Sequence, residues 1–164
     1  MKEYEFSENR VQFFFMDAAY GRAMRMAHLL ELKLVVLLMC HAVENNYPID
    51  RESIKKMTLG ALTKEFIAKF YPSNELAEEL DNMVFFRNNL AHRISETIIS
   101  AAVHENWSER VVDELVEIAN FFRETINLLE PYMERSYRAM NASEEDLLKI
   151  VNRLYPGLTN KSEA

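Results

Sequence analysis

Apolar residues recur along most of this chain at spacings of three and four residues, the pattern of one face of an α-helix. From Ser7 to Asn45 there is no proline and only one glycine, Gly21, so the pattern predicts either one long helix or two helices broken near Gly21. Within this segment, residues 13–16 are apolar on every side of a helix. A surface helix needs only one apolar stripe, so this stretch is either central in a bundle or part of an oligomer interface.

Capping and helix-breaking residues divide the middle of the chain. Residues 49–57 are expected to form a loop with room for one turn. Thr58 can cap the next helix, whose apolar face continues until Pro72 stops it. Ser73 then caps a further helix, which carries its apolar residues as far as residue 84 and beyond.

A last long helix is predicted to start near Ser108. Its apolar positions keep a period of 3.6 residues across Pro131, so the proline is expected to kink the helix without reversing the chain. A capping-box variant at 143–146 predicts a short terminal helix that ends before Pro156. The periodic positions of the long helix are Val111, Leu115, Ile118, Phe122, Ile126, Leu129, Met133, Tyr137 and Met140.

Composition agrees with an all-α fold. The chain has 164 residues, 49% of them hydrophobic, but only three glycines and four prolines, too few turn residues for a sheet protein. We expect an up-and-down helical bundle of about five to six helices, with a single domain over residues 1–157 and a flexible tail over 158–164. Cys40 is the only cysteine, which excludes an intrachain disulfide and favours a reducing, cytoplasmic setting.

Charge and hydropathy narrow the range of partners. The N-terminus carries acidic residues where a secretory signal would be positive. The strongest apolar stretch, residues 29–40, is interrupted by Glu31 and Lys33 and is shorter than the roughly 20 residues needed to cross a bilayer, so no membrane span is expected. A net charge of −7 argues against a protein that coats nucleic acid, but it leaves room for a small catalytic cleft. Residues 84–93 carry two arginines and no acid, which predicts local positive potential there.

That positive segment contains the residue types of metal-free phosphodiester chemistry. Cleavage of RNA through the ribose 2′-hydroxyl needs a base, an acid and positive donors for the charge that develops on phosphorus. The imidazole of His92 can move protons near neutral pH, and the guanidinium of Arg87 matches phosphate oxygens. Asn88 could orient the phosphate or His92, and Arg93 could hold a neighbouring phosphate. The full heptapeptide reads Arg87-Asn88-Asn89-Leu90-Ala91-His92-Arg93.

This heptapeptide resembles the Arg-x4-6-His signature of HEPN domains, all-helical proteins of about this size in which a polar residue often follows the arginine, as Asn88 does here. Residues 57–62 resemble a helix start that often precedes the motif in these domains. The resemblance implies a HEPN-type bundle and a homodimer in which the motifs of two protomers form one composite site on RNA. It further implies catalysis by Arg87 and His92. Ribonucleases of this family are frequently toxins or antiviral effectors, which raises the expectation of a neutralising protein partner.

No cofactor or metal is expected. A metal site needs three or more convergent ligands, and the sequence has no His-x-x-x-His, Glu-x-x-His or cysteine pair. The three glycines lie too far apart for a phosphate-binding loop. His28 and His41 fall in the long apolar helix, where a hydrogen-bonded core histidine is the expectation.

A second hypothesis remains open. The chain could be a noncatalytic helical module for interaction or RNA binding, in which the motif is structural and the apolar residues 13–16 pair with a partner.

Under the first hypothesis, cleavage yields 2′,3′-cyclic phosphate ends without a metal ion. On an ideal helix Arg87 and His92 are offset by roughly 140°, whereas Asn88 and His92 share a face.

Overall fold

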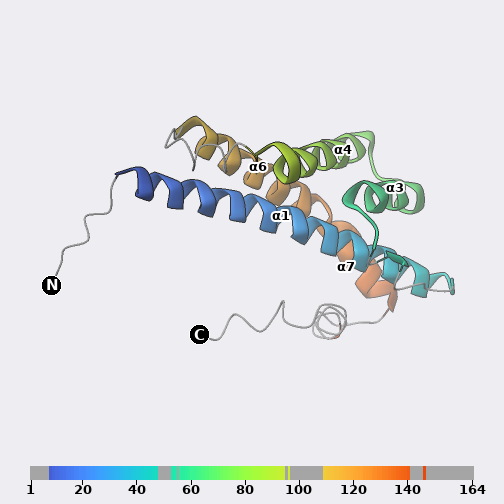
Figure 1. The fold of residues 1–164 in the computed structure, drawn as a ribbon. Helices are drawn as coiled ribbons and strands as arrows, with labels where there is room; N and C mark the ends of the chain where they lie inside the picture. The colour runs from blue at the N-terminus through green and yellow to red at the C-terminus, as the bar shows by residue number, and fades with distance from the viewer. Residues whose placement is uncertain are drawn as a thin grey trace. The chain divides into compact units, whose positions relative to one another are not determined.

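A computed structural model describes residues 8–47, 53–54, 56–94, 96, 109–140 and 146 of the chain (Figure 1). These residues are helical or lie in short connections, and no strand occurs among them. The prediction of an all-α helical fold is therefore confirmed. The number of helices expected for the whole chain, the HEPN type of the bundle and its dimerisation stay predictions.

The first helix is one long helix and is not broken near Gly21. α1 runs without a break from Glu8 to Glu44, a length of 37 residues. Gly21 lies inside it on the exposed side, so a single glycine does not interrupt the helix. The long-helix alternative is the correct one.

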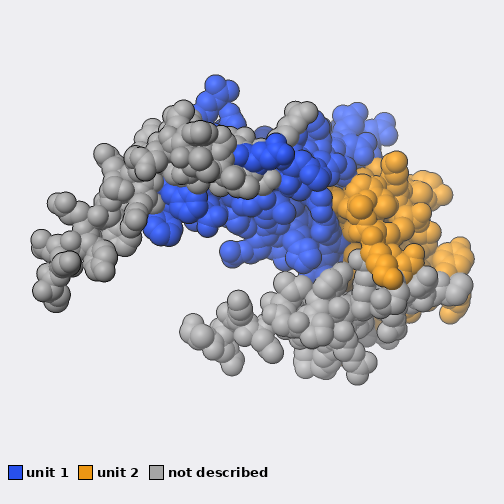
Figure 2. Space-filling view, viewed as in Figure 1, with its two compact units in different colours: residues 1–32, 72–128 blue, residues 33–71, 129–164 orange. Residues whose placement is uncertain are grey.

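The chain divides into two compact units, each built from segments distant in sequence (Figure 2). Unit 1 comprises residues 1–32 and 72–128, and unit 2 comprises residues 33–71 and 129–164. The continuous helix α1 contributes its first part to unit 1 and its last part to unit 2. The single domain expected over 1–157 stays a prediction, and the expected tail at 158–164 lies outside the described residues.

Unit 1 contains α4 (Asn74–Asn89), the π-helical segment η1 (Leu90–Ile94) and α6 (Glu109–Leu128) beside the first part of α1. α4 runs antiparallel to α1, as the colours in Figure 1 show. α4 also packs on α6, where the rings of Phe86 and Phe121 stack with centroids 5.9 Å apart. The core side chains are almost fully buried and include Met16, Ala23, Leu30, Leu80, Met83, Leu90, Leu115 and Phe122.

Unit 2 contains α3 (Leu59–Phe70) and α7 (Glu130–Met140) beside the last part of α1. Aromatic rings join α3 to α7, because Tyr132 meets Phe66 edge-on at 5.3 Å and Phe70 at 6.1 Å. Lys33 of α1 forms an ion pair with Glu130 of α7. Unit 2 is therefore held by an aromatic cluster together with a salt bridge between helices.

The predicted helix boundaries in the middle of the chain are confirmed at both caps. Thr58 accepts a hydrogen bond from the Ala61 amide, and Ser73 accepts one from the Leu76 amide, each at 3.3 Å. The sequence pattern missed the left-handed conformation of Tyr71, with φ 48°, which ends α3 before Pro72.

The expected turn in residues 49–57 appears at its end, where the Lys56 amide bonds to the Ser53 carbonyl. The last long helix is interrupted at Leu129, and the Met133 amide bonds back to its carbonyl. Pro131 follows as the second residue of α7, a position where its missing amide hydrogen costs little. The interruption lies where the proline predicts it. The expected helix start at Ser108 and the terminal helix ending before Pro156 fall on residues that are not described.

By length and composition alone, residues Phe13–Glu44 of α1 are apolar enough to cross a bilayer, over a longer stretch than residues 29–40. Half of the most apolar window is buried inside the structure. The core helix of a soluble protein passes the same test, and the expectation of no membrane span stays a prediction.

Candidate nucleic-acid site

The arginine-histidine motif spans a change of helix type. Arg87 and Asn88 belong to the last turn of α4, whereas His92 lies in η1, which begins at Leu90. The Leu90 amide donates to the carbonyls of both Phe86 and Arg87, and its side chain is fully buried. A π-helical turn holds more residues than an α-helical one, so each residue rotates by a smaller angle. The offset between Arg87 and His92 is therefore smaller than an ideal α-helix predicts.

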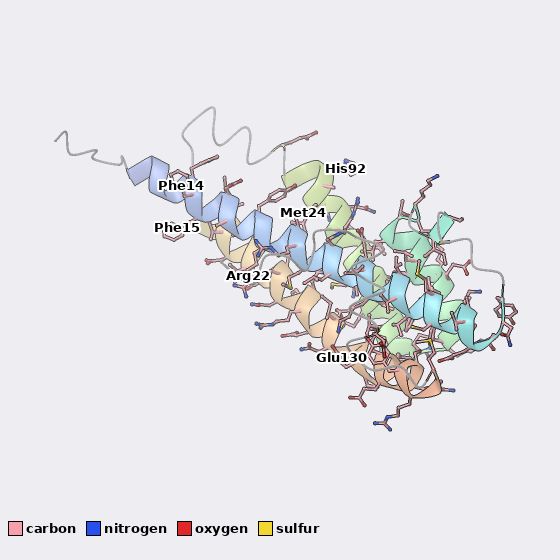
Figure 3. All side chains as sticks on the ribbon, turned by 90° about the horizontal axis from the view of Figure 1, so that it is seen from below. Phe14, Phe15, Arg22, Met24, His92 and Glu130 are labelled. Atoms are coloured by element: carbon pink, nitrogen blue, oxygen red, sulfur yellow. The ribbon has the colours of Figure 1, made fainter. Side chains whose placement is uncertain are left out.

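The motif residues lie on two different faces of this helix. Asn88 and His92 are exposed and continue the solvent stripe of Phe85. Figure 3 shows His92 projecting from the end of the helix. Arg87 continues the buried stripe, and its side chain keeps 33% exposure. The structure thus brings Asn88 and His92 to one surface and turns Arg87 toward α1. The side chain of Arg93, the other candidate for holding phosphate, lies outside what the structure describes. The buried stripe consists of Leu76, Leu80, Met83 and Leu90.

Arg87 meets a carboxylate from α1. Its Nε lies 3.4 Å from Oε1 of Glu31, whose side chain is 22% exposed. The other carboxylate oxygen of Glu31 lies 3.4 Å from Nδ1 of His28, three residues earlier on α1. One carboxylate therefore links an arginine of α4 with a histidine of α1.

The Glu31 cluster, defined as His28, Glu31 and Arg87, corrects two expectations from the sequence. His28 is not a core histidine, because its side chain is 49% exposed and its Nδ1 lies 3.4 Å from the Glu31 carboxylate. Local positive potential was expected at the motif, but Glu31 offsets the charge of Arg87. Glu31 was noted in the sequence only as an interruption of an apolar stretch. A partly buried acid inside a largely apolar stretch needs a polar partner, and that signal could have identified Glu31.

His41 departs from its expectation in a different way. It is half-buried in unit 2, where its ring packs against Phe70 at 5.3 Å and against Tyr47 at 6.2 Å. Its Nδ1 is buried and has no hydrogen-bond partner in the part of the chain that the structure describes. The role of His41 there is packing between aromatic rings.

No group of three or more histidine, cysteine, aspartate or glutamate side chains gathers to hold a metal ion among the described residues. The Glu31 cluster supplies two such side chains, and its third member is an arginine.

No protein-family model, curated protein or solved structure matches this chain. The case for a function therefore rests on the motif and on the side chains that surround it.

Proposed function

We propose that this chain is a metal-independent endoribonuclease of the HEPN type, with Arg87 and His92 at a composite site formed by two protomers. The observation that carries the proposal is the structure of the motif itself. Inside the motif the helix changes from α to π. Such π-helical turns are rare in proteins, and those that occur are often at functional sites. Asn88 and His92 are both exposed here.

The residues would divide the chemistry as follows. The 2′-hydroxyl oxygen of RNA attacks the adjacent phosphorus, and the bond from phosphorus to the 5′-oxygen breaks. His92 takes part in proton transfer, and Arg87 donates to the charged phosphate oxygens. Glu31 contacts Nε of Arg87, which carries one of the five N–H donors of the guanidinium, so the ion pair is compatible with a phosphate contact. Asn88 lies on the same surface as His92 and orients the phosphate, and Arg93 holds a neighbouring phosphate.

A homodimer supplies the second wall of this site. A two-fold axis that passes beside the motif places each motif opposite its copy. Phe14 and Phe15 of α1 are 59% and 63% exposed, and Phe85 is 61% exposed on the stripe of the motif. All three belong to unit 1, and Phe85 offers exposed apolar area beside the motif for a dimer contact. A cytoplasmic toxin or antiviral effector with a neutralising protein partner is the setting we propose.

The test is cleavage of a labelled single-stranded RNA by the purified protein in EDTA. We expect 2′,3′-cyclic phosphate and 5′-hydroxyl ends, and no cleavage where the scissile nucleotide carries 2′-deoxyribose. Arg87→Ala and His92→Ala should each lower the rate by about 10²- to 10³-fold. Arg138→Ala is a matched control, because Arg138 also pairs with a glutamate, Glu134, at 3.4 Å and lies on α7.

A noncatalytic interaction or RNA-binding module is the second candidate. The ion pair between Glu31 and Arg87 favours it, since that contact gives the arginine a structural role. Cleavage that survives both motif substitutions, or that requires added Mg²⁺, would reject the ribonuclease and favour this module.

A further inference from the structure

We propose that His28 on α1 is a second proton-transfer residue of the RNA site, held in place by the carboxylate that also holds Arg87. The inference rests on the proposed function and adds a residue from a different helix to it. Transesterification of RNA needs two proton transfers, one from the 2′-hydroxyl and one to the departing 5′-oxygen. The motif on α4 and η1 contains a single histidine, so a second proton-transfer group from the same protomer has to come from outside the motif.

The first observation is the way Glu31 joins His28 to the motif. Its two carboxylate oxygens lie 3.4 Å from Nδ1 of His28 and 3.4 Å from Nε of Arg87. A carboxylate is an acceptor only, so Nδ1 is the donor in this contact and Nε2 is the atom that exchanges a proton with RNA. A base or acid whose ring is oriented by a third group is the arrangement that recurs in catalytic triads.

The second observation is the level of the two histidines along their helices. α1 and α4 are antiparallel, and the contact between Glu31 and Arg87 marks where they meet (Figure 1). His28 lies three residues toward the N-terminus of α1, about 4.5 Å along its axis. His92 lies five residues beyond Arg87 toward the C-terminus, in η1. In antiparallel helices these directions coincide, so both histidines lie on the same side of the ion pair.

The third observation is exposure. His28 keeps 49% of its side-chain exposure and His92 is also exposed, so both rings can reach a polyanion in solvent. In the reaction, one imidazole takes the proton of the 2′-hydroxyl and the other gives its proton to the 5′-oxygen as the phosphorus–oxygen bond breaks. The step is balanced in protons and needs no oxidant or further reactant.

The experiment uses two RNA substrates that differ at one atom. In the second, sulfur replaces the bridging 5′-oxygen at the scissile bond, and the thiolate leaves without needing a proton. His28→Ala and His92→Ala should each slow cleavage of ordinary RNA by at least about 10²-fold. Only the variant that lacks the general acid should regain a rate within about tenfold of wild type on the sulfur substrate. A residue with a merely structural role would show the same loss on both substrates.

Positioning by Glu31 is tested by Glu31→Gln, which retains an amide oxygen but removes the charge. We expect a loss of roughly tenfold or more on ordinary RNA. Glu65→Gln is the matched control, because Glu65 pairs with Lys69 at the same 3.4 Å in unit 2 and should leave the rate unchanged. His28→Asn keeps an amide donor toward Glu31 without a proton-exchanging nitrogen, and it carries the test if the alanine variant fails to fold.

The outcomes separate the two proposals. If Arg87→Ala and His92→Ala abolish cleavage but His28→Ala and His28→Asn stay within about threefold of wild type, the role of His28 is rejected and the ribonuclease stands. Equal losses for His28→Ala and His92→Ala on both substrates also reject the division of proton transfers. If cleavage survives Arg87→Ala and His92→Ala, the ribonuclease proposal itself fails.

Discussion

Arg87 occupies the buried stripe of α4 although its guanidinium stays charged, and Glu31 makes that position tolerable. Burial of an unpaired charge is costly, whereas a paired and partly exposed one is not. At the exposures of these two side chains the pair contributes about 1 kcal/mol or less. The same contact that stabilises the arginine also sets the direction of its guanidinium.

Substitutions at the site and in the core should differ in their effect on stability. His92 is exposed, so His92→Ala should change the free energy of unfolding by less than about 0.5 kcal/mol. Arg87→Ala should cost about 1 kcal/mol through the lost contact with Glu31. Leu115 is fully buried in α6, and Leu115→Ala should cost on the order of 2 to 5 kcal/mol. Denaturant unfolding followed by circular dichroism measures all three, and a large loss in His92→Ala would mean that this histidine is structural.

The ionisation of the Cys40 thiol should lower the free energy of unfolding only at alkaline pH. Burial, with a smaller contribution from Glu44, raises the pKa of the Cys40 thiol from 9.0 to about 11. The folded state therefore keeps the proton that the unfolded state releases, so this stability is full below about pH 9 and is lost as the pH rises toward 11. The loss should reach on the order of 2 kcal/mol. Unfolding titrations at pH 8 and pH 11 should show it in the native chain, and Cys40→Ala should have a smaller pH dependence.

At the scale of the element, two helices depart from their simplest expectation in opposite ways. α1 is regular although it contains a glycine, since it runs unbroken through Gly21 over its 37 residues. The helix of the motif is less regular, since α4 gives way to η1 at Leu90. A helix cap depends on one side chain and a backbone amide three residues later, so Thr58 and Ser73 were identifiable in the sequence. A π-helical turn depends on the packing around it and was not.

Gly21 offers a test of how α1 is stabilised. A Cβ atom added at this position would meet no heavy atom within 4 Å, and the residue is exposed. Alanine loses less backbone entropy than glycine on entering a helix, so Gly21→Ala should stabilise the chain by about 0.5 to 1 kcal/mol. A rise in the unfolding midpoint at an unchanged denaturant slope is the expected result. A fall would indicate that this face of α1 is covered in the intact protein, by a partner or by residues outside the described part.

At the scale of the whole molecule, the exposed phenylalanines of α1 bear on the two alternatives for residues 13–16. Met16 is buried, but Phe14 and Phe15 project from the helix and are largely exposed (Figure 3). A position central in the bundle is therefore wrong for these two rings. An oligomer interface stays a prediction, and exposed rings on one unit are what such an interface requires.

The corresponding prediction is a homodimer in solution. Light scattering should report about twice the chain mass of 19.3 kDa. Replacing Phe14 and Phe15 by glutamate should shift the protein toward the monomer, because charges would oppose burial of this surface. Tyr71→Glu is a control, since Tyr71 is 85% exposed and belongs to unit 2. A strict monomer at micromolar concentration would remove the composite site and leave the residues of one protomer as the only possible catalyst.

The sequence by itself determined the helical class, the caps at Thr58 and Ser73, the break near Pro131 and the shared face of Asn88 and His92. Each of these depends on residues within a few positions of one another, where helix periodicity and local hydrogen bonds decide the outcome. Only the tertiary structure decided that Glu31 meets Arg87 and that His28 lies at the surface beside them. The contact between Glu31 and Arg87 joins residues more than fifty positions apart, and helix packing, which no local pattern encodes, brings them together.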